Sequence, residues 1–140
     1  MPIHRFLNPS TMFATRGYSH VVETQGPNRT IYLAGQLGTT ADGKFAGAPG
    51  DFRAQAEQCF ENIKLALAAV DARIEHVVKV TNYFVDIADL PIFLEVRNRY
   101  VNTKAPPAST AVQISKLAHE GALIEVEAVA VVPEQWAAAS

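Results

Sequence analysis

The chain has 140 residues, with 12 Lys and Arg against 14 Asp and Glu, so its formal net charge is −2. This balance gives no electrostatic reason to expect nucleic acid or an anionic membrane as a partner, and no segment reaches the roughly 18 uncharged apolar residues of a membrane span. One cysteine, Cys59, excludes an intramolecular disulfide and a cysteine-based metal site. We therefore expect one cytoplasmic domain over residues 1–140, and the hydrophobic fraction of 49% hints at self-association.

The first expected elements are two short strands at residues 21–23 and 30–34. The turn-rich sequence Gln-Gly-Pro-Asn at 25–28 lies between them, which predicts an antiparallel hairpin at one edge of a sheet. Residues 39–50 are rich in Gly and contain a Pro, so they predict a loop.

A helix is expected to begin after this loop, with Asp51 as its N-cap. The apolar residues that follow recur at spacings of three or four, which is typical of one buried helical face. They are Phe52, Ala56, Cys59, Ile63, Leu67 and Val70.

Residues 77–85 contain many β-branched and aromatic residues, which predicts a central strand. Lys79 within this strand needs a polar partner or a position at a hydrated edge. Asp89 then predicts the N-cap of a second helix, which Ala-Pro-Pro at 105–107 ends. Its expected helical face consists of Leu90, Phe93, Leu94, Arg97 and Val101.

Residues 110–114 and 123–132 predict the last two strands. The resulting order, ββαβαββ, indicates an α+β domain in which two helices cover one face of one mixed sheet.

The last strand contains two acids, Glu125 and Glu127, that alternation places on one face. The opposite face, with Ile124 and Val126 among its residues, is expected to be the helix-covered core. If another subunit covered the acidic face, desolvation and repulsion would raise the pKa of at least one acid, as a proton shuttle requires. The alternation is equally compatible with solvated acids, or with acids paired to Lys79 or Arg73.

Six motifs in order resemble the RidA (YjgF) family over nearly the whole chain. They are Gly-Tyr at 17–18, Ile-Tyr-Leu-Ala-Gly-Gln at 31–36, Asn-Ile at 62–63, Val-Lys-Val-Thr-Asn-Tyr-Phe-Val-Asp at 78–86, Pro-Ala-Ser-Thr at 107–110 and Ile-Glu-Val-Glu-Ala-Val-Ala at 124–130. The resemblance implies a chorismate-mutase-like fold, a homotrimer and small-molecule clefts between subunits. It also implies hydrolysis of reactive enamines and imines to a carbonyl compound and ammonia, with no cofactor and no metal.

The resemblance also implies roles for individual residues. Glu125 matches the acid that orients or activates water, and Tyr18 matches a tyrosine that lines the cleft. Gly35 matches a glycine whose backbone approaches the ligand, and Gln36 follows it. Family context leaves Glu127 as an expected interface residue, with Lys79 as a candidate partner.

The chain departs from the family where the substrate carboxylate is held. Pro-Ala is followed by Ser109, whereas active deaminases have an arginine that clamps the carboxylate through two hydrogen bonds. Serine offers one hydroxyl and no charge, so it should bind a carboxylate less strongly than arginine by roughly 2 to 3 kcal/mol. Arg97 stands where we align a helix asparagine, with Asn98 one residue on, and Ala34 replaces a common serine.

Two interpretations follow from these departures. Arg16, Arg97 or Arg99 approaches the cleft from another wall and still binds an anionic imine, or the cleft binds a less anionic metabolite with or without catalysis. The candidate functions are thus an imine deaminase of altered specificity and a non-catalytic metabolite-binding trimer. A ribonuclease is the weaker third, because the chain is acidic and its four histidines show no paired spacing.

Overall fold

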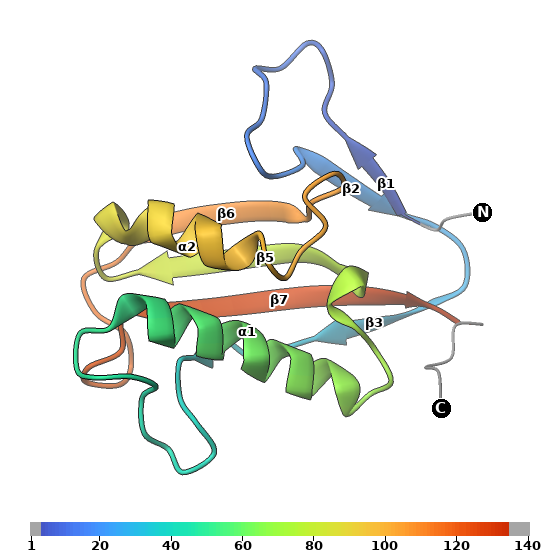
Figure 1. Ribbon diagram of the computed structural model, residues 1–140. Coiled ribbons are helices and arrows are strands. Elements are labelled where there is room, and N and C mark those ends of the chain that lie inside the picture. Colours follow the sequence, from blue (N-terminus) through green and yellow to red (C-terminus); the bar gives the residue numbers. More distant parts are fainter. Residues whose placement is uncertain (1–3, 135–140) are drawn as a thin grey trace.

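The computed structural model describes residues 4–134, which form a mixed α+β domain with one main sheet and two helices (Figure 1). The elements in chain order are β1 (His4–Leu7), β2 (Val21–Thr24), β3 (Asn28–Tyr32), β4 (Gln36–Leu37), α1 (Phe52–Ala68), the 3-10 turn η1 (Ile74–His76), β5 (Val77–Phe84), the 3-10 turn η2 (Ile87–Asp89), α2 (Leu90–Arg97), β6 (Ala108–Gln113) and β7 (Ile124–Pro133). Within these residues, no helix is long and apolar enough to cross a membrane.

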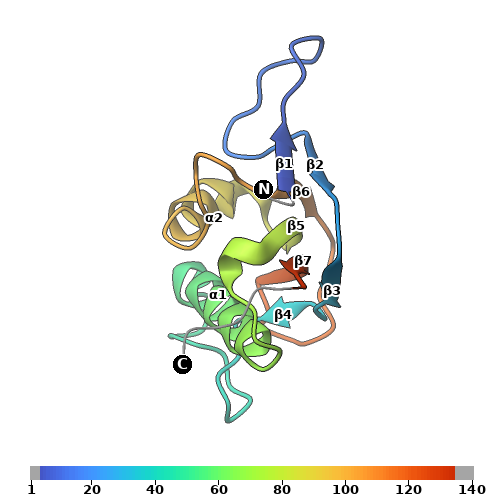
Figure 2. The ribbon, with the colours of Figure 1, turned by 90° about the vertical axis from the view of Figure 1, so that its right-hand side faces the viewer.

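The main sheet has the strand order β3-β7-β5-β6, and β4 pairs with β7 beyond the end of β3. Only β5 and β6 are parallel, so the sheet is mixed, as the sequence predicts. Both helices lie on the same face of this sheet (Figure 2). No helix of the described part of the chain lies on the other face, which we call the open face.

The core lies between the helices and the sheet. The predicted alternation of β7 is confirmed, since Ile124, Val126, Ala128, Ala130 and Val132 are each at most 1% exposed. Phe60 of α1, Phe84 of β5 and Phe93 of α2 are also fully buried, and Phe93 makes ring contacts with both of the others. These rings join both helices to the sheet.

The helix starts and ends differ in detail from the sequence prediction. Asp51 caps α1 as expected, because its Oδ1 accepts a hydrogen bond of 3.0 Å from the N–H of Ala54. Asp89 is at the N-cap position of α2, as predicted, but its side chain makes no capping bond there; Asp86 caps the preceding turn η2 by accepting from the N–H of Ala88. The predicted helical face of α2 was too long, since the helix ends at Arg97 and the chain continues in tight turns. Val70 also lies beyond its helix, 40% exposed.

The predicted hairpin between residues 21–23 and 30–34 was wrong. β2 pairs antiparallel with β1 in a separate two-stranded sheet, and β3 pairs antiparallel with β7. Figure 1 shows the β2–β3 connection passing around one end of the main sheet. The turn residues do reverse the chain, but the long apolar strand β7 offers β3 a better partner than the short β2 does.

Candidate functional site

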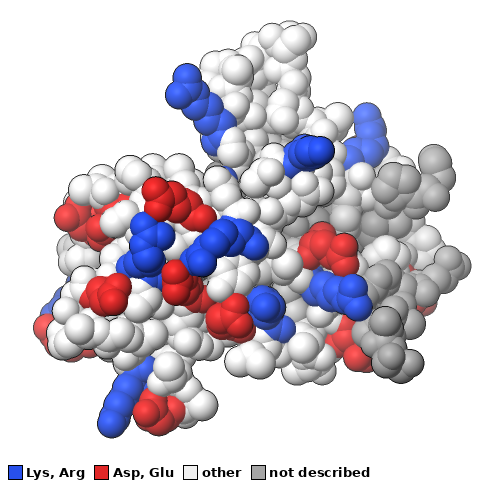
Figure 3. All heavy atoms as spheres, viewed as in Figure 1, with Lys and Arg blue, Asp and Glu red and all other residues white. Residues whose placement is uncertain are grey.

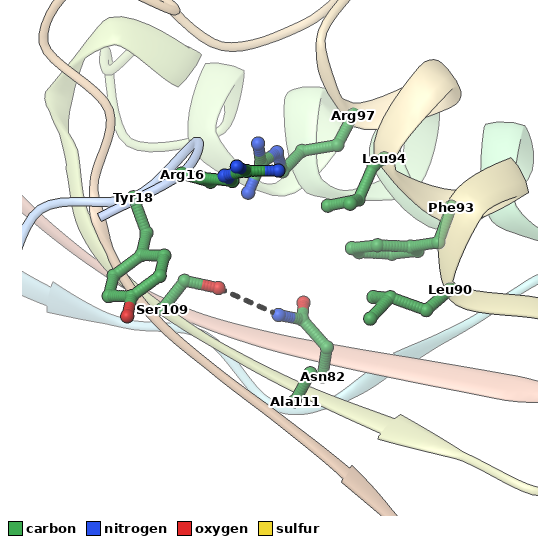
Figure 4. Close-up of a pocket in the computed structure, with 9 residues that line it drawn as sticks. All are labelled: Arg16, Tyr18, Asn82, Leu90, Phe93, Leu94, Arg97, Ser109 and Ala111. Atoms are coloured by element: carbon green, nitrogen blue, oxygen red, sulfur yellow. Dashed lines mark hydrogen bonds between the residues drawn. The ribbon is translucent and has the colours of Figure 1, made fainter. Parts of the chain in front are cut away.

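A pocket of about 280 Å³ opens between α2, the β5–β6 edge of the sheet and the loop before β2 (Figure 4). We call it the arginine pocket, because two of its lining residues are arginines. It is lined by Arg16, Tyr18, Asn82, Leu90, Phe93, Leu94, Arg97, Ser109 and Ala111.

One wall of the arginine pocket is a single face of α2. Leu90, Phe93, Leu94 and Arg97 follow one another at helical spacing, so their side chains project in the same direction. The sequence predicted these four residues on one helical face, but not that the face lines a cavity. Only Phe93 is fully buried, and the face ends in the charge of Arg97 over the cavity.

The floor of the pocket comes from two parallel strands. In their register Val80 pairs with Ser109 and Asn82 with Ala111, which places all four on the helix-covered face. Asn82 is 1% exposed; its Nδ2 donates to Oγ of Ser109 at 3.1 Å and to the carbonyl of Thr110 at 3.0 Å. Oδ1 of Asn82 has no hydrogen-bond partner among the described residues.

The loop before β2 closes the pocket, and Ser19 fixes it there. The Ser19 hydroxyl donates to the carbonyl of Pro106 at 2.6 Å, and its N–H donates to Pro107. Gly17 has φ +78°, and a Cβ on it would lie 2.7 Å from Nη2 of Arg97. The positive φ favours glycine here, and a side chain would also have to displace the guanidinium of Arg97. Gly17 lies between Arg16 and Tyr18, which both line the cavity.

Arg97 is buried without a negatively charged partner. Its residue is 4% exposed, and Asn98 Oδ1 is the side-chain acceptor for its guanidinium, 3.0 Å from Nη2. No carboxylate among residues 4–134 forms an ion pair with it. Burial lowers the pKa of Arg97 from its ordinary value. An arginine remains charged even so, and a buried charge of this kind favours an anionic ligand.

Glu125 lies on the open face, away from the arginine pocket. It pairs across the sheet with Tyr83, whereas Ser109 shares the helix-covered face of Val80. A shallow depression of about 320 Å³ on the open face includes Glu125, Glu127 and Tyr83. The carboxyl group of Glu125 lies against Gly35, whose missing side chain leaves room for it.

Glu127 and Lys79 do not pair within the chain. The hydroxyl of Tyr83 donates to Oε1 of Glu127 at 3.0 Å, and this bond raises the pKa of Tyr83. The ammonium of Lys79 donates instead to Oγ1 of Thr110 at 2.7 Å. The suggested Lys79–Glu127 pair is therefore not formed among the described residues, since each side chain bonds another group, although Lys79 and Glu127 lie diagonally on neighbouring strands.

The residues that the sequence singled out thus fall into two groups. Arg16, Tyr18, Arg97 and Ser109 line the arginine pocket, while Gly35 and Glu125 meet on the open face. Two others line neither cavity. Gln36 donates to the carbonyl of Ala34, and Asn98 is exposed and holds Arg97.

Arg99, the third candidate arginine, does not line either cavity. It forms a 2.7 Å ion pair with Glu57 of α1 on the surface. A second ion pair, between Arg53 of α1 and Glu95 of α2, joins the two helices. Figure 3 shows positive and negative side chains interspersed over this face, so it presents no continuous basic surface.

Asn82 and the apolar wall were not predicted as pocket residues. A polar residue at an inward position of a buried strand was the available signal for Asn82, since such groups need hydrogen-bond partners. No comparable signal marked Leu90 and Leu94, because half-buried apolar residues are also usual at the edge of a core.

Comparison with known proteins identifies one family. The family model described as endoribonuclease L-PSP matches residues 9–132. Protein DfrA of Myxococcus xanthus is 38% identical over 81% of this chain and 84% of its own. A 2-iminobutanoate/2-iminopropanoate deaminase of Bos taurus is 36% identical over 74% of each chain.

Solved structures agree with the sequence comparison. The Rid-family protein YyfB of Yersinia pestis has a TM-score of 0.83 and 31% identity, over 93% of this chain and 99% of its own. TdcF of E. coli, solved with bound serine, has a TM-score of 0.65 and 24% identity, over 73% of this chain and 80% of its own. At that identity the TdcF match shows the fold, and its bound serine shows that a protein of this fold binds a small ligand.

Proposed function

The chain belongs to the RidA (YjgF) family, and from this premise we propose that it hydrolyses imine or enamine metabolites to a carbonyl compound and ammonia. The observation that carries the proposal is the buried guanidinium of Arg97, which faces a cavity that no acid among residues 4–134 lines. A substrate carboxylate would supply that charge. The bovine relative, which is named as a deaminase of 2-imino acids, supports the same reaction class.

The proposed site lies between copies of the chain, in a homotrimer. One sheet separates the arginine pocket from Glu125, so both can act on one substrate only if a neighbouring copy brings its open face to the pocket. The open face also bears apolar side chains in need of cover. Tyr32, opposite Val129, is 79% exposed, and Val112, opposite Tyr83, is 38% exposed.

The proposed reaction is addition of water to a C=N bond. The arginine pocket binds the carboxylate of the imino acid and so places the electrophilic carbon beside Glu125 of the adjacent copy. Glu125 accepts a proton from water as the oxygen bonds to carbon and the C=N double bond becomes a C–N single bond. The nitrogen takes that proton back from Glu125 and a second one from the new hydroxyl, and the C–N bond breaks to release ammonia as the C=O bond forms. The products are a 2-keto acid and ammonia, with no net oxidation. Tyr18 lines the pocket and would orient the substrate.

Specificity is proposed to differ from that of relatives with an arginine after Pro-Ala. Ser109 leaves the floor of the pocket uncharged. The positive charges come instead from Arg97 on α2 and from Arg16 on the loop before β2. Gln36 and Asn98 are proposed to act indirectly, by shaping the backbone near Gly35 and by holding Arg97.

The test is keto-acid release from imines that an amino-acid oxidase generates in situ. We expect the protein to accelerate release, and Glu125→Gln to reduce the acceleration by about a hundredfold or more. Glu120→Gln, whose carboxylate is on the surface beside Lys116, is the control and should be unchanged. Size-exclusion chromatography with light scattering should report three copies. No acceleration across a broad imine panel would remove the enzyme proposal.

A non-catalytic metabolite-binding trimer is the alternative that the same pocket supports. Ligand-dependent thermal stabilisation without turnover would establish it. Ribonuclease activity is not proposed, because no histidine lines the arginine pocket and the helix-bearing face has mixed charges. RNA cleavage that survives purification and depends on Glu125 would reverse this judgement.

A further inference from the structure

We propose that the arginine pocket selects a monocarboxylate that carries a bulky apolar group, of aromatic or branched aliphatic kind. Arg97 holds the carboxylate, and the face of α2 formed by Leu90, Phe93 and Leu94 holds the apolar group. This inference rests on the proposed function and deepens it, because it names the side chain of the imino acid that would be hydrolysed.

The negative charge follows from the state of Arg97. The residue is 4% exposed, its guanidinium bonds a neutral amide, and the lining of the pocket contains no acid. A buried guanidinium without a counter-charge destabilises the fold. Because the described residues supply no negative charge beside Arg97, a bound anion would supply it. A planar carboxylate matches the fork of donors on a guanidinium.

One negative charge is enough for this pocket. Arg16 is exposed, so water already solvates its charge, and it adds attraction without requiring a second anion. Figure 4 shows the two guanidinium groups at the same side of the pocket, above Ser109 and Asn82. The remaining walls offer neutral groups, so a second carboxylate on the ligand would be pressed against apolar side chains.

The bulky apolar group follows from the α2 face. Figure 4 shows Leu90, Phe93 and Leu94 in a row, each pointing into the cavity beneath the guanidinium of Arg97. Leu90 and Leu94 are only half-buried, so a ligand that covers them gains the free energy of removing apolar surface from water. Ser109 and Ala111 are small, and they leave the opposite side of the cavity open for such a group.

The experiment measures binding without turnover, with four carboxylic-acid derivatives as probes in calorimetry. They are 3-phenylpropanoate, propanoate, 3-phenylpropanamide and pentanedioate. We expect 3-phenylpropanoate to bind at least about tenfold more tightly than propanoate, which lacks the ring, and than the amide, which lacks the charge. Pentanedioate should bind no better than propanoate. Equal binding of the amide, or tighter binding of propanoate or pentanedioate, would overturn the proposal.

Variants assign the two roles to residues. Arg97→Lys should weaken 3-phenylpropanoate about tenfold or more, because an ammonium cannot make the paired contact. Arg99→Lys, the matched change outside the pocket, should have no effect. Leu94→Ala should reduce the preference for the phenyl group, whereas Leu65→Ala, at an α1 residue 69% exposed, should preserve it.

The design separates this inference from the proposed function. If Arg97→Lys lowers the folded fraction, two other variants still test the proposal. Arg16→Gln, at an exposed position, should weaken 3-phenylpropanoate and leave 3-phenylpropanamide unchanged, and Leu94→Ala should reduce the preference for the phenyl group; no effect of either would overturn it. Selective binding without imine hydrolysis would remove the proposed function and leave the pocket assignment standing. Imine hydrolysis with equal rates for small and bulky imino acids, together with unselective binding, would remove the pocket assignment and leave the proposed function standing.

Discussion

The carboxyl group of Glu125 occupies the space that a side chain on Gly35 would fill. A Cβ atom built on Gly35 would lie 2.7 Å from Cδ of Glu125, which is closer than real Cβ contacts allow. Gly35 directly precedes β4, and Leu37 of β4 pairs with Glu125 of β7. The position of the proposed water-activating acid therefore depends on the absence of a side chain at residue 35.

Gly35→Ala should displace the Glu125 carboxyl group and lower imine hydrolysis. The added methyl group overlaps that carboxyl group, and a displacement of about 1 Å in a reacting group can reduce a rate by about a hundredfold. We expect kcat to fall more than KM rises, since the carboxylate site lies in the arginine pocket. Steady-state keto-acid assays of the variant check this.

A double-mutant cycle isolates the contact between the two residues. Gly35→Ala should lower the free energy of unfolding in the natural background and cost much less in Glu125→Ala, where no carboxyl group meets the methyl group. Urea unfolding measures both losses. If Gly35→Ala lowers the free energy of unfolding equally in the two backgrounds, the added methyl group does not clash with the Glu125 carboxyl group.

Gln55→Met should strongly destabilise the fold, although methionine and glutamine have similar volumes. Gln55 is 1% exposed; its Nε2 donates to the carbonyl of Gly121, and its Oε1 accepts from the N–H of Leu123 at 2.9 Å. Methionine leaves both backbone groups without this partner beside the start of β7. We expect a loss of about 2 to 3 kcal/mol in the free energy of unfolding.

Gln58→Met is the matched control for that change. Gln58 is half-buried on the same helix, and its amide donates to the side chain of Asn62 rather than to a strand backbone. Its loss should be under about 1 kcal/mol. If urea unfolding gives the two variants the same stability, the Gln55 bonds do not hold β7.

The sequence predicted best those features that depend on residues near one another in the chain. Asp51 and the repeated apolar spacing determine α1, and alternation determines the helix-covered face of β7. Strand partners depend on residues far apart, so the true partner of β2 was missed. That partner, β1, has only four residues and includes His4 and Arg5, which gives it little strand signal.

The candidate site was predictable as a set of residues but not as an arrangement. Family motifs named Tyr18, Ser109 and Glu125, yet only the β5–β6 and β5–β7 registers show that Ser109 and Glu125 lie on opposite faces. The same holds for the arginines. Helical spacing placed Arg97, and not Arg99, on the apolar face of the second helix, but it did not show that Arg97 is buried over a cavity while Arg99 pairs with Glu57 at the surface.

The thiol of Cys59 should be unreactive in the folded protein. The residue is 0% exposed, and burial, with a smaller contribution from the charge of Glu125, raises its pKa to about 12. Because the thiolate is the reactive form, labelling by a disulfide reagent at about pH 8 should be at least about a hundredfold slower than in urea. Cys59 is the one cysteine of the chain, so the absorbance change reports this site alone. Rapid labelling without denaturant would contradict its burial.

Tyr100→Phe should destabilise the protein at neutral pH and much less in strong alkali. The Tyr100 hydroxyl donates to Oε2 of Glu61 at 2.7 Å, joining the segment after α2 to α1, while its ring stacks on Phe60. Burial, and then this bond to Glu61, raise the pKa of Tyr100 to about 12. We expect the variant to lose about 1 kcal/mol through the missing hydrogen bond, since phenylalanine keeps the ring contact.

The pH dependence follows from the direction of that shift. An unfolded tyrosine ionises near its ordinary pKa of about 10, so between about pH 10 and pH 12 the unfolded state loses a proton that the folded state retains. The stabilisation by Tyr100 is therefore complete below about pH 10 and declines as pH rises through 12. Urea unfolding of both proteins at about pH 8 and about pH 11 should show the difference shrinking. A Tyr100 effect that stays constant with pH would exclude the proposed linkage.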